Sequence, residues 1–277
     1  MRVGLFASPQ KRIDPAVPIE MARQLLRGGA QVCANWAMQE EAQVMEKTTQ
    51  ELLTGCDRIV VFGGDGTILG AARGAAKNKI PVLGINFGRL GFLTEAEVDD
   101  CKAAADALLS GDYTVEERMM LRAEMPNGMQ YDALNDVAVS RNGGVSLLYV
   151  DMHISRQRYD SYGADGVIVA SPTGSTAYAL ACGGPVVSPT MNCMVLCPIC
   201  PHTLRARPVV LGGEETVQIS VNSRSKQARV DADGIFVGSL SEGERVTVTR
   251  SPETARFIRL KQPNFYTLLR NKLAQND

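Results

Sequence analysis

The sequence lacks an excess of either charge, a long apolar run and a regular pattern of cysteines. Its 29 Lys and Arg nearly balance 30 Asp and Glu, so nothing favours a nucleic-acid or acidic-membrane partner. No run approaches the roughly 18 apolar residues that span a bilayer, and the apolar start breaks at Pro9. The 7 cysteines are scattered, which fits a reducing compartment. We expect a cytoplasmic protein with no membrane and no nucleic-acid partner.

The 277 residues show two successive patterns of predicted secondary structure. Apolar strand-like runs alternate with helical patterns at the start, which predicts a mostly parallel sheet covered on both faces. Beyond Tyr113, short alternating runs and frequent turn signals predict an antiparallel β domain. We expect a Rossmann-like three-layer α/β domain over residues 1–115, a β domain over 116–255, and a closing helix within 256–277 that packs back on the first domain.

A glycine turn is the most informative stretch of the first domain. The apolar run 59–62 ends in Gly63-Gly64-Asp65-Gly66-Thr67, just before a helix-like pattern. Such glycines let successive N–H groups converge on an anion such as phosphate. The turn lacks the Lys and the spacing of a Walker A loop and is not GxGxxG. Asp65 beside a phosphate makes sense if it shares a Mg²⁺ with the phosphates or takes a proton from a hydroxyl, which favours phosphoryl transfer. The alternative is that Asp65 caps the next helix.

A hydroxyl-rich turn marks the second domain. Ser171-Pro172-Thr173-Gly174-Ser175-Thr176 follows an apolar run and precedes Ala177-Tyr178-Ala179-Leu180-Ala181. Hydroxyls and free N–H groups can hold a phosphate, a ribose or an amide, and Tyr178 offers a flat face to a ring. An N-capped helix with a core Tyr is the alternative.

Two further polar groups need an interpretation. Asn135-Asp136 interrupts a strand-like run, so the pair either faces a cleft or forms a turn. Cys193, Cys197, Cys200 and His202 match no familiar zinc spacing, and small apolar side chains in a strand and turn explain them better than a metal site.

Together these motifs resemble the NAD kinase family, whose members use ATP to phosphorylate the 2′-hydroxyl of the adenosine ribose of NAD and so make NADP. The glycine turn alone is shared with diacylglycerol and sphingosine kinases and with phosphofructokinases. The combination is specific and covers nearly the whole chain: residues 63–67, 84–93 (GINFGRLGFL), 135–136, 165–178, 199–204 and 265–273.

The resemblance implies roles for particular residues. Asp65 would accept the proton of the ribose hydroxyl, and Gly63, Gly64, Gly66 and Thr67 would hold the donor phosphates. The nucleotide contacts would come from Asn135, Asp136, Gly163, Asp165, Thr173, Thr176, Ala177, Tyr178, Ala179, Leu180 and Ala181. The resemblance also implies Mg²⁺ or another divalent metal with ATP, an active site between the domains, and a homodimer or homotetramer.

Three positions depart from the family pattern. Asp136 stands where Glu is usual, Ile235 stands where Gln is common, and Gly163 stands where some members carry Arg. A small uncharged residue at 163 suggests that NADH is accepted as well as NAD. Two other functions remain open at this point. A diacylglycerol-type lipid kinase would need an apolar slot or a membrane-facing patch, and the sequence has no basic amphipathic stretch to supply one. A dinucleotide sensor would gain nothing from a carboxylate beside a phosphate.

Overall fold

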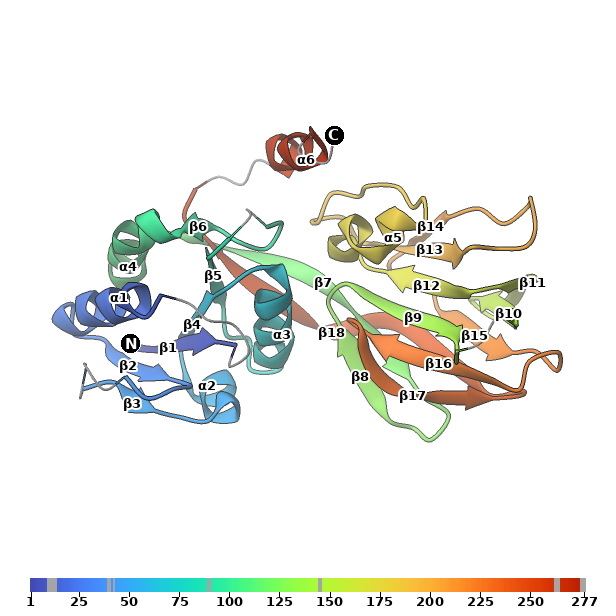
Figure 1. Ribbon diagram of the computed structural model, residues 1–277, viewed down its shortest axis with the longest axis horizontal. Helices are drawn as coiled ribbons and strands as arrows, with labels where there is room; N and C mark the ends of the chain where they lie inside the picture. Colours follow the sequence, from blue (N-terminus) through green and yellow to red (C-terminus); the bar gives the residue numbers. More distant parts are fainter. Residues whose placement is uncertain are drawn as a thin grey trace. The chain divides into compact units, whose positions relative to one another are not determined.

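The computed structural model describes residues 1–8, 14–38, 41, 43–88, 91–143, 146–261 and 265–274. The chain forms two units (Figure 1). The α/β unit comprises Met1–Glu117 and Ala255–Asp277, and the β unit comprises Arg118–Thr254. The chain passes from one unit to the other within two long strands, β7 (Thr114–Glu124) and β18 (Arg245–Arg259).

A parallel sheet organises the α/β unit. Its strands pair in the order β5-β4-β1-β2-β3, and β6 and the end of β18 pair with β5. The strands are β1 (Arg2–Ala7), β2 (Gln31–Ala34), β3 (Met45–Glu46), β4 (Arg58–Phe62), β5 (Val82–Asn86) and β6 (Ala96–Glu97). Strand β5 is buried throughout, as expected for a parallel strand that is covered on both faces.

Helices cover this sheet on both sides. They are α1 (Ala16–Arg27), α2 (Thr49–Gly55), α3 (Asp65–Ala76) and α4 (Cys101–Ser110), with a short 3₁₀ turn η1 (Val98–Asp100) before α4. Apolar residues of α1 and α4 share one core with Val3 and Leu5 of β1. On the opposite face, Gly4 admits Leu52 of α2 and Gly84 admits Ile68 of α3, because a Cβ at either glycine would crowd those side chains. The predicted three-layer α/β arrangement is confirmed.

The C-terminal segment contains the end of a strand followed by a helix. Strand β18 continues to Arg259, and its residue Phe257 pairs with Val82 of β5. Phe257 and Ile258 are almost completely buried, so the end of this strand extends into the core of the α/β unit. Helix α6 spans Phe265–Ala274.

The β unit packs two antiparallel sheets face to face. One sheet has the order β14-β13-β12-β9-β16-β17, and the other contains β11-β10-β15-β18 together with β7 and β8. Their bounds are β8 (Gln130–Ala133), β9 (Asp136–Arg141), β10 (Leu148–Ile154), β11 (Gln157–Ala164), β12 (Gly166–Ala170), β13 (Cys193–Ile199), β14 (Val209–Gly212), β15 (Val217–Val221), β16 (Gln227–Ala232) and β17 (Ile235–Ser241). The predicted antiparallel β domain is confirmed.

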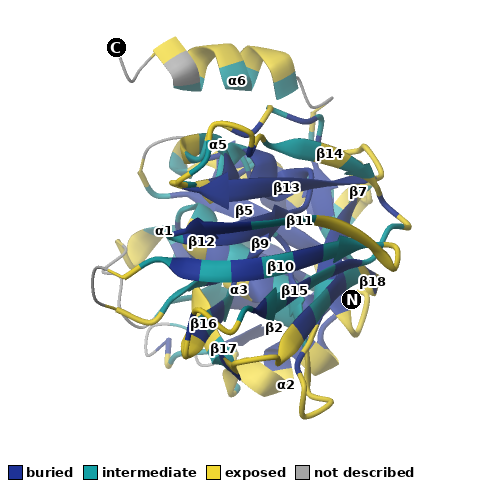
Figure 2. Cartoon of the chain, turned by 90° about the vertical axis from the view of Figure 1, so that its right-hand side faces the viewer, coloured by how far each residue is buried: buried dark blue, intermediate teal, exposed yellow. Residues whose placement is uncertain are grey.

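Strand β12 lies between two cores, which is why its sequence is apolar without interruption. Val167 and Val169 join the core between the sheets, whereas Ile168 and Ala170 join a second core on the outer face. That outer face is covered by η2 (Thr173–Thr176), α5 (Tyr178–Ala181) and the residues that follow. Figure 2 shows β12 and β13 as a largely buried pair. The hydroxyl-rich turn therefore begins at the end of a fully buried strand.

Candidate active site

The glycine turn follows the C-terminal end of β4, which is where ligands bind in open α/β sheets. Gly63 has φ +155°, and a Cβ there would lie 2.8 Å from Thr67 Oγ1. The N–H of Gly63 donates to the carbonyl of Ile85 at 3.0 Å, which ties the turn to β5. Gly64 is the N-cap residue of α3, so the first turn of that helix begins within the predicted phosphate-binding residues. A Cβ at Gly66 would meet nothing within 4 Å, so local packing does not require that glycine.

Asp65 is the first residue of α3, yet its side chain does not cap that helix. Its carboxylate instead accepts the N–H of Phe92 at 2.8 Å and the N–H of Leu93 at 3.0 Å. A Cβ at Gly91 would lie 1.8 Å from Asp65 Oδ1, so the loop can approach the carboxylate only with glycine at this position. The helix-capping alternative is therefore wrong, because Asp65 joins two separate predicted motifs.

The partner loop, residues 91–95, begins within the last three residues of the GINFGRLGFL motif and has its own internal hydrogen bonds. Thr94 Oγ1 accepts the N–H of Gly91 at 2.9 Å, and the Thr94 side chain is buried. At the start of the motif, the Asn86 side-chain amide donates to the carbonyl of Gly88. Arg89 and Leu90, between these points, lie outside the described residues. The loop thus donates two backbone N–H groups to Asp65 from a short turn that is closed by its own hydrogen bond.

In the β unit, Asn135 lies in the bend between β8 and β9, and Asp136 is the first residue of β9. The carboxylate of Asp233 accepts the N–H groups of Leu134, Asn135 and Asp136 at 2.9, 2.7 and 3.3 Å. The Asp233 backbone N–H in turn donates to the carbonyl of Asp136. Asp233 has φ +51° and is followed by Gly234, so a turn that the sequence marks only as a chain reversal fixes the predicted contact pair.

Asp136 carries a buried carboxyl group whose pKa is raised. Only 7% of the residue is exposed. Burial, together with the negative charges of Asp233 and Asp231, raises the pKa of Asp136 to about 7. Asp136 therefore changes protonation near neutral pH, and its protonated form can donate a hydrogen bond.

The hydroxyl-rich turn packs directly on this polar pair. Ser171 donates its backbone N–H to the carbonyl of Asn135 at 2.8 Å, and its hydroxyl donates to the carbonyl of Leu134. A Cβ at Gly174 would lie 2.0 Å from the carbonyl oxygen of Asn135. Thr173 is buried and lies 3.5 Å from the buried guanidinium of Arg118, a residue that the sequence did not single out. The structure thus brings two predicted stretches, about 40 residues apart, into contact.

Tyr178 stands at the start of α5 and is 49% exposed. Burial raises the pKa of the Tyr178 hydroxyl, and nearby Asp165 and Asp136 act in the same direction. The alternative of an N-capped helix with a core Tyr is wrong, because the stretch forms two short helical pieces without a side-chain cap and Tyr178 is exposed, whereas the adjacent Ala179 is fully buried in the outer core. Tyr178 consequently has an accessible ring, next to a residue that is buried in the outer core.

Asp165 and Gly163 lie across from the end of β13. The N–H of Asp165 donates to the carbonyl of Ile199, and the carbonyl of Gly163 accepts the N–H of His202. The carboxylate of Asp165 pairs with Arg141 at 3.0 Å. A Cβ at Gly163 would lie 3.0 Å from Tyr149 Cε1, so the ring of Tyr149 occupies the space beside this glycine. Among the described residues, no three His, Cys, Asp or Glu side chains gather as metal ligands, at Cys193–His202 or elsewhere.

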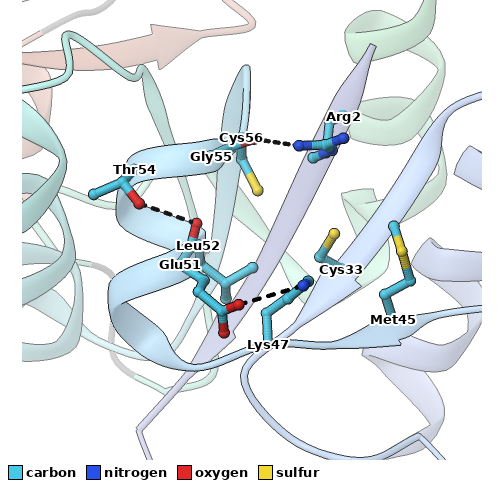
Figure 3. Close-up of a pocket in the computed structure, with 9 residues that line it drawn as sticks. All are labelled: Arg2, Cys33, Met45, Lys47, Glu51, Leu52, Thr54, Gly55 and Cys56. Carbon is cyan, nitrogen blue, oxygen red and sulfur yellow. Dashed lines mark hydrogen bonds and ion pairs between the residues drawn. The ribbon is translucent and has the colours of Figure 1, made fainter.

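Two cavities lie apart from these residues. One of about 320 Å³ in the α/β unit is lined by α2, β2 and the start of β1 (Figure 3). It holds Cys56, whose pKa burial raises to about 12, so this thiol is not a nucleophile at neutral pH. The other, of about 460 Å³, lies in the β unit beside Arg141, Arg224 and Lys226. None of the predicted site residues lines either cavity.

Comparison with known proteins decides the family. The family model of the ATP-NAD kinase N-terminal domain matches residues 3–113, and that of the C-terminal domain matches residues 134–260. The chain belongs to the ATP-NAD kinase family. An NAD kinase from Moorella thermoacetica is 38% identical over 99% of this chain and 89% of its own, and one from Desulforamulus reducens is 42% identical over 82% of this chain and 81% of its own.

Solved structures of ATP-NAD kinases share the fold. An NAD kinase from Archaeoglobus fulgidus in complex with ATP has a TM-score of 0.79 and 28% identity, and the match covers 99% of both chains. A yeast NADH kinase complexed with NADH has a TM-score of 0.88 over 99% of this chain and 87% of its own. At 24% identity, the second likeness concerns the fold alone.

Family membership makes this chain an enzyme that phosphorylates NAD with ATP. The alternatives of a lipid kinase and of a dinucleotide sensor are thereby set aside. The described residues of this ATP-NAD kinase family member include no helix that is both long and apolar enough to cross a membrane. The contributions that sequence reasoning missed are those of Gly91, Asp233 and Arg118, each of which acts on a predicted residue through a backbone or a buried contact.

Proposed function

We propose that the enzyme transfers the terminal phosphate of ATP to the 2′-hydroxyl of the adenosine ribose of NAD, with Asp65 as the proton acceptor. The observation that carries the proposal is the carboxylate of Asp65 at the start of α3, within the glycine turn and fixed by two backbone N–H groups. A fixed carboxylate beside a helix N-terminus combines a base with a site for phosphate.

The bonds formed and broken in this phosphoryl transfer balance. The 2′-oxygen forms a bond to the terminal phosphorus, the bond from that phosphorus to the bridging oxygen breaks, and ADP leaves. The hydroxyl proton passes to Asp65. The backbone of Gly63, Gly64 and Gly66 and the side chain of Thr67 would hold the donor phosphates, and positioning with charge stabilisation would supply most of the acceleration.

The divalent ion belongs, in this proposal, to the donor substrate. The described residues gather no cluster of three carboxylate, His or Cys ligands. Mg²⁺ or a similar ion bound to the triphosphate of ATP would neutralise part of its charge. The role of the chain is then to hold the phosphate oxygens and to orient the ribose.

The NAD contacts would come from the β unit. Asn135 and Asp136 present polar groups for ribose hydroxyls or an exocyclic amine, and Tyr178 presents an accessible ring. Asp165, Thr173 and Thr176, together with the segment Ala177–Ala181, complete the proposed set. The contacts between Ser171 and Asn135 support this grouping, because they hold the two predicted stretches as one rigid piece.

We also propose that NADH is accepted. Gly163 places no charge beside the dinucleotide, and a larger side chain would have to displace the ring of Tyr149. A neutral nicotinamide ring would therefore meet no charge-based discrimination at this position. An NADH rate below about one-hundredth of the NAD rate, measured with the same enzyme and ATP, would reject this part.

A cytoplasmic homodimer or homotetramer completes the proposal. The edge strand β17 exposes Ile235 and Phe236, each 51% exposed, and neighbouring exposed apolar residues are typical of an interface. Mass in solution, measured by light scattering after size exclusion, would report the number of subunits, and a monomer would contradict it.

The test of the reaction itself is the incubation of the protein with ATP, Mg²⁺ and NAD. A dehydrogenase specific for NADP detects the product and distinguishes the 2′-phosphate from any other phosphorylated form. We expect NADP in proportion to enzyme and none without ATP. Absence of NADP with an active-site concentration of enzyme would contradict the proposed function.

A further inference from the structure

The C-terminal end of the loop 91–95 is anchored by hydrogen bonds to residues at the end of β18 and just after it. Glu95 Oε1 accepts the N–H groups of Leu260 and Lys261 at 2.9 and 3.2 Å, and Glu95 Oε2 accepts from the Arg259 guanidinium at 3.0 Å. The side chains of Arg259 and Glu95 are only 5% and 9% exposed. Arg259 pairs with Glu116 as well, so the buried cation is matched by carboxylates and hydrogen bonds. The end of the loop therefore has one well-defined position.

The same loop is held from its other end by helix α6. The ring of Phe92 lies 6.3 Å, centroid to centroid, from the ring of Phe265, and the ammonium of Lys272 lies 5.0 Å from the Phe92 ring centroid. Aromatic pairs and cation–π contacts at these distances are attractive. Phe92 is also the residue whose N–H donates to Asp65 Oδ2. One residue thus connects the C-terminal helix with the carboxylate.

We propose that Glu95, Arg259 and Lys272 are positioning residues for Asp65, acting through the loop 91–95. The proposal rests on the role of Asp65 in the proposed function. None of the three touches the reacting atoms. Glu95 and Arg259 fix the position of the C-terminal end of the loop against the end of β18. Lys272 holds the ring of Phe92 in place.

The internal hydrogen bonds of the loop explain how such anchors reach the carboxylate. Thr94 Oγ1 holds the N–H of Gly91, so residues 91–94 move as one piece. A displacement at Phe92 or Glu95 therefore moves the N–H groups of Phe92 and Leu93 together with Asp65. A misplacement of about 1 Å in a catalytic group can cost roughly 10²-fold in rate, so even a small movement is measurable.

Lys272→Gln tests the upper anchor, and Arg270→Gln, on an exposed position of the same helix, is its matched control. We expect Lys272→Gln to lower kcat roughly two- to fivefold, with the KM for ATP and the melting temperature unchanged, and we expect no effect from the control. If the two variants have the same kcat, Lys272 is not a positioning residue.

Glu95→Gln tests the lower anchor, because it keeps the shape of the side chain and removes the charge that faces Arg259. We expect roughly a tenfold or larger loss of kcat, with unchanged binding of NAD by titration. Since this variant could also lose stability, Arg259→Lys is measured beside it. Arg259→Lys keeps the cation and should retain more kcat than Glu95→Gln; equal losses that follow the melting temperature would overturn this arm.

A double-mutant cycle decides whether the anchors act through Asp65. In an Asp65→Asn background, Lys272→Gln and Glu95→Gln should lower the residual kcat no further, because the group that they position no longer accepts a proton. Equal fold-losses in both backgrounds would mean that the residues act independently of Asp65 and would overturn the proposal.

Hydrogen exchange separates this proposal from the proposed function. The amides of Phe92 and Leu93 should exchange roughly two- to tenfold faster in Lys272→Gln and Glu95→Gln than in the wild type and in Arg270→Gln. Unchanged exchange would overturn the positioning role even if the enzyme makes NADP. An inactive wild-type enzyme with altered exchange in the variants would instead count against the proposed function alone.

Discussion

Gly91→Ala is the substitution in which the structure predicts the largest effect from a single methyl group. The new Cβ would lie 1.8 Å from Asp65 Oδ1 and 2.5 Å from its Cγ, whereas real Cβ contacts essentially never fall below 3.0 Å. The carboxylate or the loop must therefore move by more than about 1 Å. The movement breaks or lengthens the hydrogen bonds from Phe92 and Leu93.

The size of the effect follows from those two bonds. Hydrogen bonds to a charged acceptor are worth roughly 1.5–3 kcal/mol each, and water replaces part of that when they break, which leaves a loss of about 2–3 kcal/mol. In a protein of this size the melting temperature should fall by roughly 5–10 °C. Displacement of the base should reduce kcat about 10²-fold.

The assay is NADP formation at saturating ATP and NAD, together with a thermal melt of the same preparation. Gly70→Ala is the matched control, because Gly70 lies on α3, is exposed, and would place its Cβ in open space. Alanine is a better helix former than glycine, so the control should melt at the same temperature or slightly higher. If Gly91→Ala matches the control in kcat and in melting temperature, the contact between the loop and Asp65 is not as described.

Three further predictions concern other contacts. Gly174→Ala would place a Cβ 2.0 Å from the carbonyl oxygen of Asn135, so we expect a KM for NAD raised roughly tenfold and a KM for ATP unchanged, by steady-state kinetics. Because burial raises the pKa of Asp136 to about 7, its contribution to stability is fully present below pH 4 and is lost as the pH rises to 7. Asp136→Asn should therefore gain stability over the wild type, by up to a few kcal/mol, as the pH of chemical denaturation rises from 4 to 8; a difference independent of pH would contradict this. Thr48→Ala removes the capping box of α2 with Glu51 and should cost about 1 kcal/mol of unfolding free energy, with kcat unchanged.

The sequence predicts the fold because both domains follow simple periodicities. Apolar runs such as Ile59–Phe62 are uninterrupted when a parallel strand is covered on both faces, and β12 is uninterrupted because two cores lie against it. The end of β18 was harder to predict. Its residues Phe257 and Ile258 stand near a helical pattern, and only the pairing with β5 identifies them as a strand.

The candidate site was predicted from side chains, whereas the structure builds it largely from backbone groups. The sequence marks the turn around Asp65 and the stretch 84–93 as separate motifs, but the hydrogen bonds between them need the sheet to bring the ends of β4 and β5 together. Asp233-Gly234 is an ordinary turn sequence and carries no local sign of a further role. Its three hydrogen bonds to the segment 134–136 span about 98 residues of chain and therefore leave no local signal.

The most direct test of the account is the turnover of Asp65→Asn beside that of the wild type. The substitution keeps the size of the side chain and removes its ability to accept the ribose proton. We predict a loss of roughly 10²–10⁴-fold in kcat for NADP formation, with ATP and NAD still bound, which is the usual range for a general base. A variant that retains more than about a tenth of the wild-type rate would contradict the role of Asp65.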